Sequence, residues 1–137
     1  MKILVIDHQA HQVHEFYKSL TEAGYTLKVS NTGKEGLVDV LSFQPDLILL
    51  GQMLPYMRGN DVLKALKNNQ QTAHIPVIML SHFHDKTLVD EAMDLGATDY
   101  IAKDTIAGPD LVEKVNAIIR EQHGGTGWQS IDANELL

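Results

Sequence analysis

The sequence contains no cysteine and no run of basic residues. Without cysteine, disulfides and thiolate metal sites are excluded. Eleven lysines and arginines against eighteen aspartates and glutamates give a net charge of -7, which argues against a nucleic-acid surface because phosphate binding needs a clustered basic face. The first apolar run, residues 3–6, is too short for a signal peptide or a membrane span. We therefore expect a cytoplasmic domain that binds neither nucleic acid nor membrane.

The chain has 137 residues, of which 44% are hydrophobic and 21% charged, as in one ordinary globular domain. Short apolar runs recur along it, at residues 3–6, 47–50, 76–80 and 100–102. Continuous runs of this length are typical of strands that are covered on both faces, as in a parallel sheet. A fifth candidate, residues 26–29, alternates between polar and apolar side chains, as an edge strand does.

Helical patterns separate these runs. Apolar residues at helical spacing predict five helices, marked by Val13, Phe16, Leu20 and Ala23, by Leu37, Val40 and Leu41, by Val62 and Leu66, by Leu88, Ala92 and Leu95, and by Leu111, Val115 and Ile118. Thr32 and Glu35 have the spacing of a capping box, and Pro109 suits the first turn of the last helix. The alternating order predicts an α/β fold: a doubly wound, flavodoxin-like (βα)5 domain with a five-stranded parallel sheet in the order 2-1-3-4-5.

The helical pattern ends near residue 122, and three glycines follow within residues 124–127. Glycine-rich stretches of this kind are typical of flexible breaks. We predict one domain at residues 1–122 and a flexible linker or tail at residues 123–137. The tail would end a stand-alone adaptor or lead into a further domain of a longer regulator.

In such a sheet the functional cleft lies beyond the carboxyl ends of the strands. It would collect Asp7 and His8 and residues 51–55, 81–84 and 103–104. The surrounding motifs resemble the receiver domain of response regulators in order and spacing, over roughly residues 1–121. These motifs are ILVID at 3–7, PDLILL at 45–50, LP at 54–55 with Gly59, PVIMLS at 76–81 and GATDYIAK at 96–103.

The resemblance implies a phosphoryl switch of two-component or phosphorelay signalling. In that family an acidic pair and an aspartate hold Mg²⁺, and this aspartate accepts a phosphoryl group from a histidine kinase. A hydroxyl and a lysine then grip the phosphate, and an aromatic side chain reports the change to a partner-binding face. By this resemblance Asp7 is the first acid, Ser81 the hydroxyl, Tyr100 the aromatic and Lys103 the lysine, with Met53 in the same pocket.

Two positions depart from the family. His8 stands in place of the second acid, and Gly51 stands in place of the phosphoacceptor. Glycine has no nucleophilic side chain, and imidazole is a poor ligand for Mg²⁺, which takes hard oxygen ligands. Phosphoryl transfer relies on positioned charge and metal. We therefore predict a degenerate pseudo-receiver that is not an enzyme, with no catalytic residue, no cofactor, and weak or absent Mg²⁺ binding.

Such a domain would act by phosphorylation-independent protein–protein interaction. The resemblance places the partner surface on the fourth helix, fifth strand and fifth helix, with Lys86, Val89, Tyr100 and Lys114. The partners would be signalling proteins, an effector domain of a longer chain, or a second copy in a homodimer.

Simpler roles stay open for the retained residues. Lys103 could pair with Asp7 or Asp104, Ser81 could cap the turn that follows it, and Tyr100 could simply pack. Asp104 also stands where the family usually has proline, so the peptide bond before it is expected to be trans.

Two other functions are open. The chain could be a phosphorylatable regulator that uses another acid, such as Asp7 or Asp85. It could also be a flavodoxin-like small-molecule binder, although residues 7–11 lack the glycine and hydroxyl of a phosphate-binding loop. Convergence of four histidines at the cleft would suggest a Zn²⁺ site, formed by His8, His11, His82 and His84.

Overall fold

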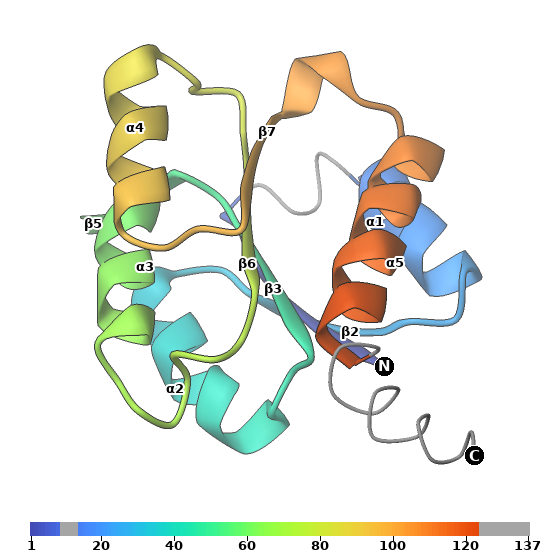
Figure 1. Cartoon of the computed structure of the whole chain (residues 1–137), viewed down its shortest axis with the longest axis horizontal. Coiled ribbons are helices and arrows are strands. Elements are labelled where there is room, and N and C mark those ends of the chain that lie inside the picture. Colours follow the sequence, from blue (N-terminus) through green and yellow to red (C-terminus); the bar gives the residue numbers. More distant parts are fainter. Residues whose placement is uncertain (9–13, 124–137) are drawn as a thin grey trace, which may run out of the picture.

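The computed structural model describes residues 1–8 and 14–123, which form a parallel sheet between two layers of helices (Figure 1). The five-stranded sheet has the order β2-β1-β3-β6-β7, which confirms the predicted order, with β6 and β7 as the fourth and fifth predicted strands. The strands are β1 (Lys2–Ile6), β2 (Thr26–Ser30), β3 (Leu47–Leu50), β6 (Val77–Ser81) and β7 (Asp99–Ala102).

The helices cover both faces of the sheet, so the doubly wound α/β fold is confirmed. In Figure 1, α1 and α5 lie on one side of the sheet, and α2, α3 and α4 lie on the other. Their bounds are α1 (His14–Glu22), α2 (Gly33–Phe43), α3 (Gly59–Lys67), α4 (Lys86–Asp94) and α5 (Gly108–His123).

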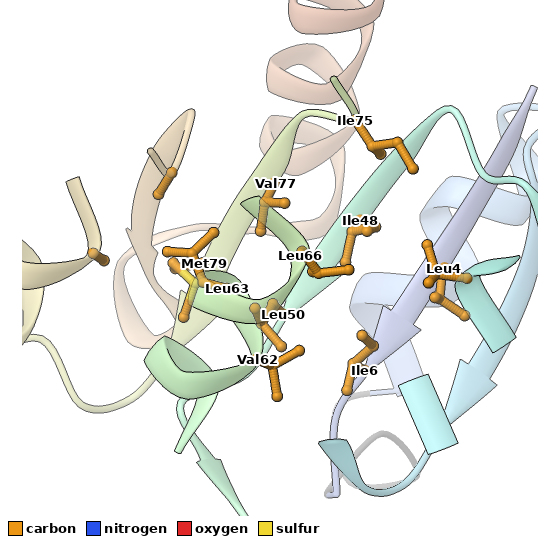
Figure 2. Close-up of a cluster of buried hydrophobic side chains, with 13 residues drawn as sticks. Leu4, Ile6, Ile48, Leu50, Val62, Leu63, Leu66, Ile75, Val77 and Met79 are labelled. Atoms are coloured by element: carbon orange, nitrogen blue, oxygen red, sulfur yellow. The ribbon is translucent and has the colours of Figure 1, made fainter. Parts of the chain in front are cut away.

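The central strands supply the core because they are covered twice. Every residue of β3 and β6 is buried, whereas the edge strand β2 is largely exposed or half-buried. Alternate residues of β1 point to opposite faces: Leu4 and Ile6 join the cluster under α2 and α3 (Figure 2), and Ile3 and Val5 join the cluster under α1 and α5. This packing fixes the strand register and therefore the positions of the residues at the carboxyl edge.

Local signals in the sequence mark the start of α2 and the ends of α1 and α4, as expected. Thr32 is the N-cap of α2, and its side chain accepts a hydrogen bond from Glu35 N at 3.0 Å. The Glu35 carboxylate, however, accepts from Asn31 N at 2.8 Å rather than from the cap residue. Gly24 and Gly96 follow α1 and α4 with φ of 100° and 105°, the left-handed conformation that favours glycine.

Some elements differ from expectation. A two-stranded hairpin of β4 (Met53–Leu54) and β5 (Met57–Arg58) follows β3, and a short 3-10 helix covers Lys103–Thr105. Helix α5 extends to His123, the first residue of the predicted tail, while residues 124–137 lie outside the described part of the chain. Val13, predicted to begin α1, also lies outside it.

The described residues contain no cis peptide bond, so the trans bond predicted before Asp104 is confirmed. None of the helices in the described part of the chain is long and apolar enough to cross a bilayer.

Candidate functional site

The carboxyl ends of the strands bring the predicted pocket residues together. Asp7 follows β1, Gly51 follows β3, Ser81 ends β6 and Lys103 follows β7, and all four line one small pocket together with Met53. His8 is exposed and does not line this pocket. The parallel register of neighbouring strands accounts for the arrangement, because each strand ends at the same edge of the sheet.

Asp7 and Lys103 form a buried ion pair. Lys103 Nζ lies 2.8 Å from Asp7 Oδ2, and the side chains are only 4% and 6% exposed, respectively. The expected pairing of Lys103 is therefore confirmed for Asp7. Asp104 instead lies near His84, with 3.6 Å between Asp104 Oδ1 and His84 Nε2 at the surface. The buried charges of Asp7 and Lys103 need each other, since an isolated buried charge would carry a large desolvation penalty.

Tyr17 on α1 is a third member of this cluster that the sequence did not reveal. Its hydroxyl donates a hydrogen bond of 2.7 Å to Asp7 Oδ2. Burial, and then the nearby Asp7 charge, raise the pKa of Tyr17 well above its ordinary value. The hydroxyl therefore stays protonated and acts as a donor to the carboxylate.

Gly51 occupies a position that has room for a side chain. Its backbone N–H donates to Ile6 O at 2.9 Å, and a Cβ added to it would meet Asp7 Oδ1 at 3.5 Å, an ordinary contact. Gly59 is the opposite case, because an added Cβ would lie 2.1 Å from Gly51 O. Packing therefore requires glycine at position 59 but not at position 51.

Two buried amide side chains, Gln52, which lines the pocket, and Asn60, are bonded to each other, and we call them the buried amide pair. They are 1% and 0% exposed. Gln52 Nε2 donates to Asn60 Oδ1 at 3.0 Å, and Gln52 Oε1 accepts from Asn60 N at 2.8 Å. Reciprocal bonds of this kind satisfy polar groups that would otherwise be costly to bury.

The remaining N–H groups of the buried amide pair reach two other elements. Gln52 Nε2 also donates to the Tyr100 hydroxyl on β7 at 3.2 Å. Asn60 Nδ2 donates to two oxygens of α4, Leu88 O at 3.3 Å and Glu91 Oε1 at 2.9 Å. Arg58 binds the same Glu91 carboxylate through both terminal nitrogens, at 2.9 and 3.0 Å. Sequence patterns gave no indication of this network, because isolated polar residues carry no periodic signal.

The sequence of the chain matches a known protein family. The family model described as "Response regulator receiver domain" matches residues 3–116. The chain belongs to the response regulator receiver domain family. It is thus a receiver domain of two-component signalling, as the motifs predicted.

The chain is similar to transcriptional regulatory proteins and to a methylesterase. The chain is 32% identical over 136 residues to the phosphate regulon transcriptional regulatory protein PhoB of Pseudomonas aeruginosa, covering 98% of this chain and 58% of the relative. It is 34% identical to the transcriptional regulatory protein CpxR of Escherichia coli, covering 96% and 54%. A protein-glutamate methylesterase/protein-glutamine glutaminase of Anaeromyxobacter dehalogenans is 31% identical, with 99% and 41% covered. The chain therefore spans about half the length of these relatives.

Solved structures agree on the fold. A CheY-like receiver from Methanospirillum hungatei superposes with a TM-score of 0.83 at 24% identity, covering 90% of this chain and 97% of that one. The receiver domain of the Francisella response regulator 1452 gives 0.77 at 28% identity, with 88% and 97% covered. The five-stranded receiver architecture is therefore shared across distant sequences.

Within this receiver, Ser81 and Tyr100 both form hydrogen bonds with the backbone of Phe83. Ser81 Oγ accepts from Phe83 N at 3.0 Å, which confirms that Ser81 caps the turn after β6. The Tyr100 hydroxyl donates to Phe83 O and accepts from Gln52, so its role is more than plain packing. Both residues thus hold the segment after β6 against the sheet edge.

The proposed histidine site finds no support in the described geometry. His11 lies outside the described residues, and His82 and His84 are exposed. Across residues 1–8 and 14–123, no three histidine or carboxylate side chains come together in a way that could hold a metal ion.

The predicted interaction face contains a real depression. Val89, Tyr100 and Lys114 line an open groove of about 530 Å³ between α4, β7 and α5. Lys114 Nζ lies 3.6 Å from Asp99 Oδ2 at its border. Lys86 does not line the groove, and its exposed ammonium pairs with Asp90 at 2.6 Å.

Proposed function

We propose that this receiver is a degenerate pseudo-receiver that signals by phosphorylation-independent protein–protein interaction, without enzymatic activity. The observation that carries the proposal is Gly51 at the end of β3, next to Asp7. By the family resemblance this is the place of the phosphoacceptor, and glycine has no atom to accept a phosphoryl group. The proposal assigns the signal to the surface of the domain instead of its cleft.

The residues present do not fit the Mg²⁺ site that the family implies. Asp7 is the single acid among positions 7, 8 and 51, and its Oδ2 already accepts from Lys103 and Tyr17. His8 is exposed and provides nitrogen ligands. Mg²⁺ requires oxygen ligands in near-octahedral geometry and gives up its water reluctantly. These contacts support weak or absent Mg²⁺ binding.

Phosphorylation of another acid is the alternative to be tested. Asp7 is buried in its ion pair, and Asp85 lies at the N-cap of α4 rather than at the end of β3. Neither carboxylate takes the place of a side chain at position 51. The flavodoxin-like alternative has less support, because the chain's pocket at the carboxyl edge is small and lined by the ion pair.

The interaction face would lie on α4, β7 and α5, with Lys86, Val89, Tyr100 and Lys114. Receiver domains interact with signalling proteins and effector domains. The partner of this chain would be such a protein, an effector domain of a longer chain, or a second copy. We expect this domain to bind neither nucleic acid nor membrane and to lie in the cytoplasm.

The decisive experiment offers the protein a phosphoryl donor. Incubation with acetyl phosphate and Mg²⁺ should add no mass to the wild type, because position 51 has no acceptor. Gly51→Asp alone should bind Mg²⁺ weakly, and Gly51→Asp combined with His8→Asp should bind it more tightly in a calorimetric titration. A stoichiometric, acid-labile phosphate on the wild-type protein would overturn the proposal.

A second measurement locates the interaction. Lys86→Glu and Lys114→Glu reverse charge on the proposed face and should weaken capture of a partner in pull-downs, or dimerisation in analytical ultracentrifugation. Ser81→Ala removes a hydroxyl in the cleft and should change neither. The reverse ranking would mean that the cleft still receives a signal.

A further inference from the structure

Helix α4 is packed loosely against the rest of the domain. All of α4 lies in the described part of the chain, and Ala92 is its one buried residue. Leu88 and Val89 are half-buried, and Lys86 and Asp90 are exposed. An element with few buried apolar contacts opens locally at low free energy. Polar contacts therefore have a large share in fixing where this helix lies.

Those polar contacts converge on the buried amide pair. Asn60 Nδ2 donates to α4 at Leu88 O and at Glu91 Oε1. Gln52, bonded to Asn60, donates to the Tyr100 hydroxyl on β7. The same two amides thus hold both sides of the groove that Val89 and Tyr100 line.

The amides leave little freedom for another arrangement. Both N–H groups of each amide are used, since Gln52 Nε2 donates to Asn60 and Tyr100, and Asn60 Nδ2 donates to Leu88 and Glu91. Moving α4 or Tyr100 away would leave a donor unpaired in a site that is 0–1% exposed. An unpaired buried donor carries its full desolvation penalty, which is larger than the net gain from one hydrogen bond.

We propose that the buried amide pair of Gln52 and Asn60 holds α4 and Tyr100 in a single arrangement and so fixes the interaction face without a phosphoryl signal. This inference rests on the proposed function and identifies what sets the state of the face. A switch needs an input that binds two states with different affinity. Here no such input is needed, because the hydrogen bonds of Gln52 and Asn60 favour a single position of α4 and Tyr100.

The first experiment compares two neighbouring acids of α4 by amide hydrogen exchange, in the absence of any phosphoryl donor. Glu91→Ala removes the acceptor that Asn60 and Arg58 share, whereas Asp90→Ala removes only a pair with Lys86 on the same helix. The side chains of Asp90 and Glu91 are 57% and 39% exposed, so both variants should fold. Glu91→Ala should speed exchange of the α4 amides about tenfold relative to α5, and Asp90→Ala should not.

The second experiment changes the pair itself. Asn60→Leu replaces the amide by an apolar side chain of similar shape, and Thr72→Val is its matched control. Thr72 is also buried and lies after the C-terminal end of α3. Its hydroxyl donates to Leu66 O, in the last turn of α3, at 2.6 Å. Asn60→Leu should loosen α4 selectively, while Thr72→Val should leave the ratio of α4 to α5 exchange unchanged.

Equal exchange of α4 in the wild type and the Glu91→Ala variant would overturn the inference, whether or not Asn60→Leu folds. Selective loosening of α4 in Asp90→Ala or Thr72→Val would overturn it too. Neither result depends on phosphorylation. The mass measurement with acetyl phosphate therefore tests the proposed function separately from the role of the amides.

Discussion

The carboxyl edge of the sheet holds two buried polar clusters of different character. The ionic cluster of Asp7, Lys103 and Tyr17 joins β1, the residue after β7 and α1. The neutral cluster is the buried amide pair: Gln52, the second residue after β3, bonds Asn60 on α3 and Tyr100 on β7, and Asn60 bonds α4. Asp7, Lys103 and Gln52 line the same small pocket as Gly51, and the members of both clusters are buried.

The difference lies in where each cluster's hydrogen bonds end. In the ionic cluster, Lys103 and Tyr17 both donate to the same oxygen, Asp7 Oδ2. The amides reach oxygens on α4 and the Tyr100 hydroxyl on β7, and Tyr100 lines the groove of the proposed interaction face. The ion pair thus lies in the pocket beside Gly51, whereas the contacts to α4 and β7 begin at neutral amides and end at Leu88 O, the Glu91 carboxylate and the Tyr100 hydroxyl.

The strongest test of this contrast is to remove one charge. Lys103→Ala leaves the Asp7 carboxylate without its cation, and we expect a loss of about 3–5 kcal/mol in the free energy of unfolding, as for other broken buried pairs. Urea denaturation measures it. Lys67→Ala is the control, because the Lys67 ammonium is bonded to two carbonyl oxygens and not to an acid. An equal loss in both variants would show that the charge of Asp7 is unimportant.

Removing the Tyr17 hydroxyl should have a smaller effect. Tyr17→Phe keeps the ring and deletes one donor to Asp7, so we expect a loss of about 1.5–3 kcal/mol from a hydrogen bond to a charged group. Tyr25→Phe deletes a hydroxyl bonded to the neutral Asn116 in a half-buried place, and should cost less. In the Lys103→Ala background the Tyr17 effect should change, which would reveal the shared oxygen as a coupling between the two.

The smallest expected effect concerns the acids around Arg58, at the outer end of the amide network. Hydrogen bonding to Arg58 lowers the pKa of Glu91 and the pKa of Asp61 below the ordinary values of these groups. A lowered folded-state pKa gives stability that is present above the unfolded value and is lost as the pH falls through the folded one. Below about pH 4.5 the wild type should therefore lose stability.

The size of this loss should be less than about 1 kcal/mol, because the side chains are exposed and screened by salt. Arg58→Met is the control: its stability should vary less over the same acidic range, and added salt should reduce the difference. If the wild type and Arg58→Met gave parallel profiles of stability against pH in urea denaturation, the Arg58–Glu91 pair would not support the amide network.

The sequence indicated the sheet, its helices and the residues at the ends of the strands. Apolar runs and helical spacing are physical consequences of burial on two faces, so they are visible in one sequence. The same reasoning narrowed the partner of Lys103 to two acids, and only three-dimensional structure distinguishes Asp7 from Asp104.

The residues that were missed are polar ones whose burial depends on distant segments. Gln52 is buried because Asn60 and Tyr100, 8 and 48 positions away, supply its partners. Tyr17 lies beside the apolar positions of α1, but the spacing does not say that its hydroxyl reaches Asp7. The hairpin of β4 and β5 consists of two-residue strands, which are too short for alternation to be recognised.

The glycines of the domain differ in how much room their surroundings leave for a side chain. An added Cβ at Gly33, Gly36 or Gly59 would meet other atoms at 2.1–2.6 Å, so selection on folding alone would hold these positions. Gly51 has contacts no closer than 3.5 Å and an ordinary backbone conformation. The scaffold therefore has room for a Cβ at this position. Substitution of Gly51 can thus probe the chemistry of the pocket separately from the integrity of the fold, which substitution of Gly59 cannot do.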